Sequence, residues 1–496
     1  MKQALRCTAL ATAVSASTAM AADEVRDQFY WLGEINKATL VINTDEGLLN
    51  VEDAPKFAKA IQAVIDQGNQ PGGKRPAAVI RFEPLLIEEA GPEITLLHAG
   101  RSSQDMHATY RAAILRDDLL TLAQQLHDTS KTLVDLAEKH AETVVPNYTN
   151  GVAAQPNSYG HYLLGHAAGL SRDAQRIQQT YDRINRSAMG TTVLNGTRWP
   201  LNRERMSDYL GFAKPVENAY DASQISSMEH PVEVGSIVTS IGLHTGHFVE
   251  DLLTQYAQPR PWILLQEGGD NTYVSSAMPQ KRNPGLLNNT RSSASTAVSL
   301  ALGPVIQAHN ITPGMVDPKN VKTNSTMVAS GTTALKNWDK VLKALVISQE
   351  RALEELNSDW TASQELADEL MQRHLLPFRT GHHFASEVTS YAKANNIKPL
   401  DFPYSEAQRI YAEIVQGTNY PQTLPMTEVE FRNALNPQSI VESRATAGGP
   451  QLSEMQRMLV SSREALARDQ VWITQSRQAI DQAQQKLNTD FSKYLQ

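Results

Sequence analysis

The chain has 496 residues, of which 41% are hydrophobic, 6% are aromatic and 20% are charged. This length exceeds one ordinary hydrophobic core and predicts two or three domains. The formal net charge of −8 argues against a nucleic-acid partner. No stretch approaches the ~20 consecutive apolar residues that a membrane span needs, so no membrane partner is expected. Few aromatic residues and little strand-like alternation favour a helical protein.

The first 21 residues have the features of a secretory signal peptide. Lys2 and Arg6 precede a run of small and apolar residues, and Ala19-Met20-Ala21 is typical of a cleavage site. The only cysteine, Cys7, lies in this segment, so the mature chain would carry no thiol in an oxidising compartment. We therefore expect a soluble periplasmic protein. The alternative is a disordered or misassigned N-terminus.

The rest of the chain divides into three helical parts, at residues 22–112, 113–357 and 358–496. The first part contains short amphipathic patterns, and the last contains the smaller C-terminal helices. In the central part, leucines keep heptad spacing, which is typical of a long helix in a bundle. This helix is expected to end near Val145-Pro146 and to be followed by a short loop. Four further long helices are expected around residues 163–184, 232–256, 284–302 and 325–356. The leucines of the first helix are Leu115, Leu119, Leu122, Leu126, Leu133 and Leu136.

Polar side chains gather just before the first of these long helices. Ser102, Ser103 and Gln104 could hold an anion through their donors and the helix dipole. The alternative is that Ser102 or Ser103 only caps the helix, and these residues taken alone favour the cap.

A second polar stretch, Ser275–Pro284, precedes a later long helix. Its serines could supply a nucleophile or base, while Lys281 supplies a positive charge and Asn283 supplies hydrogen-bond donors. Such groups suit a carboxylate or a developing oxyanion. The small residues are typical of a lid that closes over a substrate. A polar loop that merely caps the next helix accounts for the stretch equally well.

Three segments resemble signature sequences of the fumarase/aspartase superfamily, and argininosuccinate lyase in particular. Residues 274–283 resemble Gly-Ser-Ser-x-Met-Pro-x-Lys-x-Asn, with Val274 at the glycine position. His98–Asp105 resembles His-Thr-Gly-Arg-Ser-Arg-Asn-Asp, and Pro146–Pro156 resembles Pro-Gly-Tyr-Thr-His-Leu-Gln-x-Ala-Gln-Pro. The resemblance covers nearly the whole expected mature chain. It implies an all-α, three-domain fold with a central five-helix bundle, assembled as a homotetramer with a twenty-helix core.

The resemblance also implies a reaction, the β-elimination of fumarate from a succinyl-type dicarboxylate, an N-substituted aspartate. Ser275 would be the base, and Lys281 and Asn283 would stabilise the aci-carboxylate intermediate. Each site would combine segments of three subunits, and no metal or organic cofactor is implied. His244 and His247 lie three residues apart, but with no third ligand nearby we expect no metal site. The expected substrate-binding residues are Ser102, Ser103, Gln104, Thr149, Asn150, Gln155, Ser276 and Asn288.

The chain departs from this family at a pair of positions. Asn150 replaces a histidine and Asn288 replaces the glutamate that would pair with it. A histidine beside a carboxylate moves protons near neutral pH, which two asparagines cannot do. The tyrosine, glutamine and lysine with which argininosuccinate lyase holds the amino-acid half of its substrate are also absent from residues 311–319, although Lys319 or Lys322 could substitute for the lysine.

Three hypotheses therefore remain open. The first is a lyase with a rebuilt site, and the second is a non-catalytic periplasmic protein that binds dicarboxylates or amino acids on the lyase fold. The third, a cycloisomerase like the carboxymuconate branch of the family, is weaker.

Overall fold

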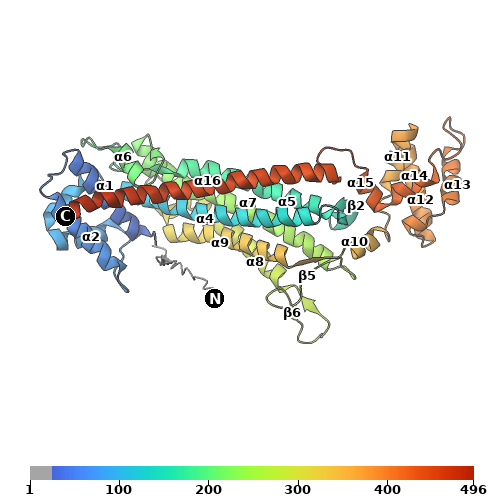
Figure 1. The fold of residues 1–496 in the computed structure, drawn as a ribbon, viewed down its shortest axis with the longest axis horizontal. Coiled ribbons are helices and arrows are strands. Elements are labelled where there is room, and N and C mark those ends of the chain that lie inside the picture. The colour runs from blue at the N-terminus through green and yellow to red at the C-terminus, as the bar shows by residue number, and fades with distance from the viewer. Residues whose placement is uncertain (1–24) are drawn as a thin grey trace, which may run out of the picture.

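The computed structural model describes residues 25–496, so the expected signal peptide and Cys7 lie outside the described residues. The described chain forms an elongated molecule built almost entirely from helices (Figure 1). Its strands are short and pair only two at a time. The prediction of an all-α fold is confirmed.

The N-terminal part lies at one end of the molecule. It contains α1 (Gln28–Asp45), α2 (Ala54–Asn69), α3 (Val79–Ala90) and the 3-10 helix η1 (Pro92–His98). Helix α1 is buried around its whole circumference, because it packs against α2, α4 and α16. The buried core of this end includes Phe29, Trp31 and Leu32.

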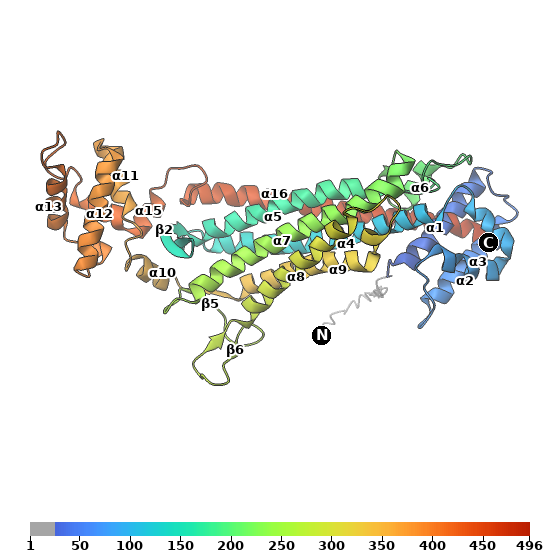
Figure 2. The same ribbon diagram turned by 180° about the vertical axis from the view of Figure 1, so that it is seen from behind.

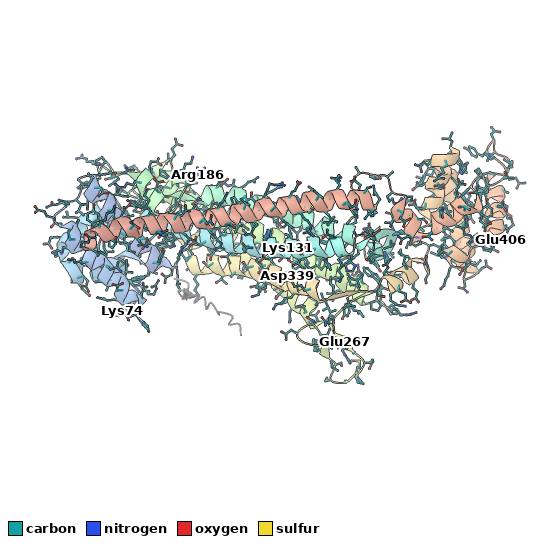
Figure 3. All side chains as sticks on the ribbon, in the orientation of Figure 1. Lys74, Lys131, Arg186, Glu267, Asp339 and Glu406 are labelled. Carbon is teal, nitrogen blue, oxygen red and sulfur yellow. The ribbon has the colours of Figure 1, made fainter. Side chains whose placement is uncertain are left out.

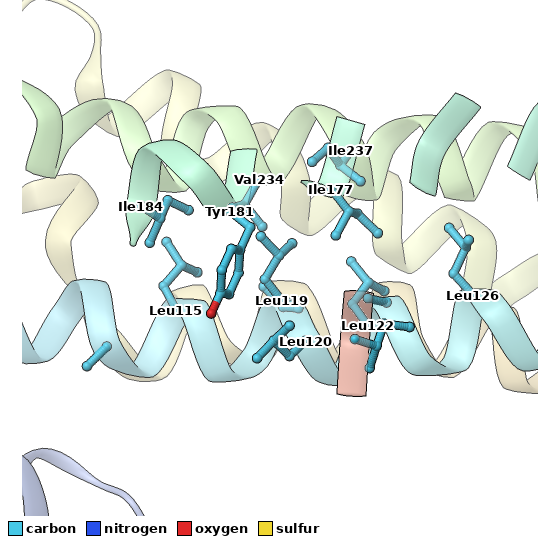
Figure 4. Packing of buried hydrophobic residues seen from close by; sticks show 14 of the residues in the cluster. Leu115, Leu119, Leu120, Leu122, Leu126, Ile177, Tyr181, Ile184, Val234 and Ile237 are labelled. Carbon is cyan, nitrogen blue, oxygen red and sulfur yellow. The ribbon is translucent and has the colours of Figure 1, made fainter. Parts of the chain in front are cut away.

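The predicted central helices are present. They are α4 (Ser103–Lys139), α5 (Tyr159–Ile184), α7 (Ser226–Tyr256), α8 (Gly285–Ala308) and α9 (Val321–Ala344). The heptad leucines of α4 point toward apolar side chains of α5 and α7 (Figure 4). Leu119, Leu122 and Leu133 are fully buried, so the heptad pattern correctly predicted which face of α4 is buried. This first long helix begins ten residues before the expected boundary at residue 113.

Two predicted helix ends differ from the structure. Helix α4 ends at Lys139 rather than near Pro146, and the expected loop is a hairpin of β1 (Val144–Thr149) and β2 (Val152–Ser158). Its turn, Asn150-Gly151, has positive φ at both residues, 54° and 76°, as a type I′ turn requires. Likewise, α9 ends at Ala344, and the predicted helix continues as β8 (Leu345–Ile347) and α10 (Gln349–Leu356).

The helices of the expected C-terminal part, residues 358–496, divide between two hydrophobic cores. Helices α11 (Gln364–His374), α12 (Phe378–Ala394), α13 (Tyr404–Val415) and α14 (Glu428–Leu435) surround a core of their own. After α15 (Pro437–Glu442), the 41-residue helix α16 (Leu452–Ser492) returns along the bundle to the N-terminal part (Figures 1 and 2). Its apolar residues join the central core instead.

Short elements complete the described chain. Helix α6 (Arg203–Tyr209) lies between β3 (Arg186–Ser187) and β4 (Lys214–Pro215), which pair with each other. Strand β5 (Ile263–Leu265) pairs with β8, and β6 (Tyr273–Val274) pairs with β7 (Arg282–Asn283). The remaining helical turns are η2 (Asp221–Ile225), η3 (Asp317–Lys319) and η5 (Lys493–Leu495) next to the long helices, and η4 (Pro399–Asp401) in the C-terminal core.

Candidate active site

The polar segment before α4 is built around the buried carboxylate of Asp105. One oxygen accepts the Ser102 N–H at 2.8 Å, and the other accepts N–H groups of residues 190, 191 and 192, each at 3.1 Å. Ser102 in turn caps the helix, because its Oγ accepts the Gln104 N–H at 3.2 Å. Burial raises the pKa of Asp105, while these backbone donors oppose the rise. The capping alternative is therefore confirmed for Ser102.

Arg101, the residue before Ser102, has a structural role. Arg101 is buried and donates to Asn36 Oδ1 at 2.8 Å and to Thr39 Oγ1 at 3.1 Å, which joins the segment to α1. Burial lowers the pKa of Arg101 to about 10. Within residues 25–496 the side chains of Ser103 and Gln104, both half-buried, have no hydrogen-bond partner, so they remain available to a ligand.

The β1–β2 hairpin carries Thr149 and Asn150 at its exposed tip. Next to the tip, the hydroxyl of Tyr148 donates to Glu355 of α10 and accepts from Trp262 Nε1 at 3.1 Å. Gln155, also exposed, donates a long 3.4 Å bond to the Gln364 side chain. The turn geometry thus presents Thr149 and Asn150 to solvent at the end of the bundle.

The Ser275 loop connects β6 to β7 and projects from the side of the bundle (Figures 1 and 2). Ser275 Oγ accepts the N–H groups of Ala277 at 3.4 Å and of Met278 at 3.2 Å. The Ser275 N–H donates to the carbonyl of Lys281 at 3.2 Å, which places these two residues opposite each other across the loop. Backbone donors on a hydroxyl oxygen suit an oxygen that carries negative charge.

The remaining predicted residues of this loop lie at its surface. Lys281 and Ser276 are exposed, and Asn288 is exposed in the first turn of α8. Asn283 donates to the Tyr273 carbonyl at 3.4 Å. The loop is closed at its base by Arg282, whose Nε lies 3.1 Å from Glu267 Oε2. Figure 3 marks the position of Glu267 on this projecting part of the chain.

One chain does not bring these three segments together. Gln104 begins α4 and the β1–β2 hairpin follows its other end, and a 37-residue helix is about 55 Å long. The Ser275 loop projects separately from the bundle (Figure 2). A single site that contains all three segments therefore requires more than one chain.

The sequence offered Lys319 only as an alternative to Lys322 and did not single out Arg111. In the structure Arg111 of α4 and Lys319 of η3 line one cleft near the Gln104 segment. The available signal was the α4 stripe of Gln104, Ala108 and Arg111, spaced so that all three lie on one helix face. Residues 25–496 contain no group of three side chains that could hold a metal ion. The same part of the chain has no helix that is both long and apolar enough to cross a membrane.

Comparison with known families gives two matches. A model described as Lyase matches residues 86–299, and one described as Argininosuccinate lyase C-terminal matches residues 360–442. Argininosuccinate lyase of Methanosarcina barkeri is 28% identical over 470 residues, and argininosuccinate lyase 1 of Shouchella clausii is 26% identical over 472 residues. Each alignment covers 93% of this chain and 92% of the relative.

Solved structures share the fold. EDDS lyase in complex with formate superposes with a TM-score of 0.83 at 23% identity, covering 94% of this chain and 92% of that one. The 3-carboxy-cis,cis-muconate lactonizing enzyme of Pseudomonas putida gives 0.63 at 19% identity, covering 90% and 96%. The fold and the sequence matches together define an enzyme of the C–N lyase class. The matched models and relatives support the placement of the chain in the fumarase/aspartase superfamily.

Proposed function

We propose that the protein catalyses β-elimination from an N-substituted aspartate and releases fumarate and an amine. The observation that carries the proposal is the pair of backbone N–H groups that donate to Ser275 Oγ, with Lys281 across the same loop. The argininosuccinate lyase relatives support it, as does the fact that an EDDS lyase variant of the same fold was crystallised with bound fumarate.

In the proposed reaction, Ser275 acts as an alkoxide stabilised by its backbone donors and by the charge of Lys281. It takes a proton from the carbon next to a substrate carboxylate, and that carboxylate becomes a dianionic aci-carboxylate held by Lys281 and Asn283. Collapse of this intermediate forms the C=C bond of fumarate and breaks the C–N bond. Gln104, Ser103 and Thr149 hold the substrate carboxylates, while Ser102 acts mainly through its cap.

The loss of the histidine–glutamate pair is compatible with an amine leaving group. An alkylammonium nitrogen already carries a proton at neutral pH, so it leaves as a neutral amine without a protein acid. Asn150 and Asn288 then have a binding role only, which their amide donors and acceptors can fulfil.

We further propose that the sites form in a homotetramer. The support is the separation of the three segments in one chain and the exposed apolar side chains of α8, which include Leu302, Val305 and Ile306. Monomers rarely leave such a helix face uncovered by a partner. Export to the periplasm through residues 1–21 is likewise a proposal, and a mature N-terminus close to Ala22 by mass spectrometry would support it.

The first test measures fumarate by ultraviolet absorbance with a panel of N-(1,2-dicarboxyethyl) amino acids, argininosuccinate, malate and aspartate. We expect Ser275→Ala to lower the rate roughly 100- to 10,000-fold, the usual contribution of a positioned base. Ser461→Ala, an exposed serine of α16, is the matched control and should keep full activity. Fumarate release that survives Ser275→Ala would contradict the assignment of the base.

The Asn150/Asn288 pair also favours a second candidate, a periplasmic protein that only binds dicarboxylates. A variant with Asn150→His and Asn288→Glu separates the two. Loss of a native lyase activity in this variant would support a rebuilt enzyme. A large gain of activity over a silent parent whose melting temperature rises with fumarate or succinate would support the binding protein.

A further inference from the structure

The loop at residues 190–196, between β3 and α6, has a strained backbone. Thr192 and Val193 have φ of 47° and 78°. Of the six non-glycine residues with positive φ in residues 25–496, these two are the only β-branched ones and the only sequence neighbours. A β-branched side chain fits this conformation poorly, so the surrounding structure must hold both residues in it. Because such strain clusters at functional sites, the loop is a candidate for a role beyond packing.

The carboxylate of Asp105 holds this loop in place. The side chain is fully buried, and its Oδ2 accepts the N–H groups of Gly190, Thr191 and Thr192, each at 3.1 Å. Three successive N–H groups that point at one oxygen fix the direction of the backbone just before Val193. Hydrogen bonds to a carboxylate are stronger than those between neutral groups, so this one side chain can oppose the strain.

The loop has one further hydrogen bond to a part of the chain that is distant in sequence. Thr192 Oγ1 donates to the carbonyl of Gly100 at 2.9 Å. The Gly196 N–H donates to the Thr191 carbonyl at 2.9 Å and the Leu194 N–H donates to the Thr192 carbonyl at 3.1 Å, so these two bonds stay inside the loop. Both distant contacts therefore come from the segment that precedes and begins α4.

The other oxygen of Asp105 holds the start of α4. Its Oδ1 accepts the N–H groups of Ser102 at 2.8 Å and of Met106 at 3.0 Å. Ser103 and Gln104, the residues proposed to bind the substrate carboxylates, lie between these two donors. One carboxylate therefore fixes both the strained loop and the proposed binding segment.

We propose that Asp105 is a positioning residue, which holds Ser103 and Gln104 in place for the substrate through its contacts with α4 and loop 190–196. When this carboxylate is lost, the strain at residues 192 and 193 moves the loop away from α4, and the binding segment loses its support. The proposal rests on the proposed elimination, because that reaction assigns the substrate carboxylates to this segment. It adds a residue that does not touch the substrate and yet controls its binding.

The first test compares KM and kcat of Asp105→Asn with those of wild type, on the panel substrate from which wild type releases fumarate fastest. The amide has only one acceptor oxygen, so it cannot hold both the loop and the helix start. We expect KM to rise roughly tenfold and kcat to change less than about threefold, because Ser103 and Gln104 bind the carboxylates in ground state and transition state alike. Asp128→Asn, at an exposed aspartate of the same helix, should change neither constant.

Glycine at residue 193 separates positioning from general destabilisation. Val193→Gly removes the β-branched side chain from a φ of 78° and so relaxes the strain that Asp105 opposes. In the Asp105→Asn background it should lower KM again by roughly fivefold. Leu194→Gly, at the exposed next residue, relaxes no positive φ and should give no such rescue. In the wild-type background we expect Val193→Gly to raise the melting temperature and Leu194→Gly to lower it.

Hydrogen exchange measures the opening of the loop directly. Asp105→Asn should speed exchange at residues 190–196 by roughly tenfold, and Val193→Gly should slow it again. Faster exchange with an unchanged KM would contradict the proposal and leave Asp105 with a structural role only. A raised KM that Val193→Gly and Leu194→Gly change equally would contradict it as well.

A second variant keeps the proposal open to test if Asp105→Asn does not fold. Thr192→Ala removes only the bond to the Gly100 carbonyl and should raise KM roughly threefold. Thr121→Ala, at an exposed threonine of α4, is its control. An unchanged KM in Thr192→Ala would contradict the proposal.

Calorimetry with fumarate separates this proposal from the elimination. Asp105→Asn should weaken fumarate binding, and the double variant with Val193→Gly should restore it in part, even in a protein that releases no fumarate. That result without any lyase activity would overturn the reaction but keep the positioning role. Equal fumarate binding in all variants would overturn the positioning role, and a wild type that neither binds nor releases fumarate would overturn both.

Discussion

Asp118 is a single residue whose burial destabilises its charged form. Burial raises the pKa of this carboxyl from 3.8 to about 6, even though Ser325 donates a hydrogen bond to it. The folded state therefore binds this proton more tightly than the unfolded state. Stability from this group is complete below pH 3.8 and is lost as the pH rises through 6.

Asp118→Asn should remove that loss, since an amide can accept the Ser325 bond without a charge. We expect the variant to be more stable than wild type by about 1–2 kcal/mol at pH 7, with little difference near pH 4. Urea unfolding at the two pH values measures the effect. An equal stability change at both values would show that charge burial is not the cause.

The sequence singled out some residues of the proposed site and not others, for identifiable reasons. Ser275, Lys281 and Asn283 share one short motif, so a local pattern was enough to bring them together. Arg111 is one charge among many on a 37-residue helix, and its burial depends on η3 and α7, which lie far away in sequence. No local pattern separates Lys319 from Lys322; only packing places the first inside the cleft.

Among the elements, the β1–β2 hairpin replaces a predicted loop. The dipeptide Asn150-Gly151 was the missed signal, because both residues tolerate positive φ and such a pair is the strongest short-range mark of a tight hairpin. The family resemblance singled out Asn150 because it stands where the family has a catalytic histidine. Its backbone conformation gives it a structural role as well.

Gly151→Ala should therefore destabilise the protein through backbone strain. A Cβ at Gly151 would meet only Thr254 Cγ2 at 3.7 Å, so the expected loss of about 1 kcal/mol comes from the φ of 76° and not from a clash. Gly165→Ala in α5 is the control, because a Cβ there meets nothing within 4 Å and should stabilise the helix by up to about 1 kcal/mol. Thermal unfolding measures the melting temperatures of both variants. Equal shifts in the two melting temperatures would refute backbone strain at Gly151 as the cause.

At the scale of the whole molecule, the long helices could be predicted but the route of the chain between them could not. Heptad spacing identifies the buried face of α4 because that pattern is local. The return of α16 along the bundle depends on contacts with α1, α4 and α5, which are distant in sequence. Gln104 and Thr149 lie near opposite ends of α4 in one chain. This separation is the reason for proposing a site shared between chains.

A site shared between chains is tested most directly by mixing two inactive variants, Ser275→Ala and Gln104→Glu, with a different affinity tag on each. Mixed tetramers are isolated through both tags after unfolding and refolding together. If Ser275 and Gln104 of one site come from different chains, some sites in a mixed tetramer contain neither change. We predict that these tetramers release fumarate although neither parent does. Isolated mixed tetramers that stay inactive, while wild type treated in the same way recovers its activity, would contradict a site shared between subunits.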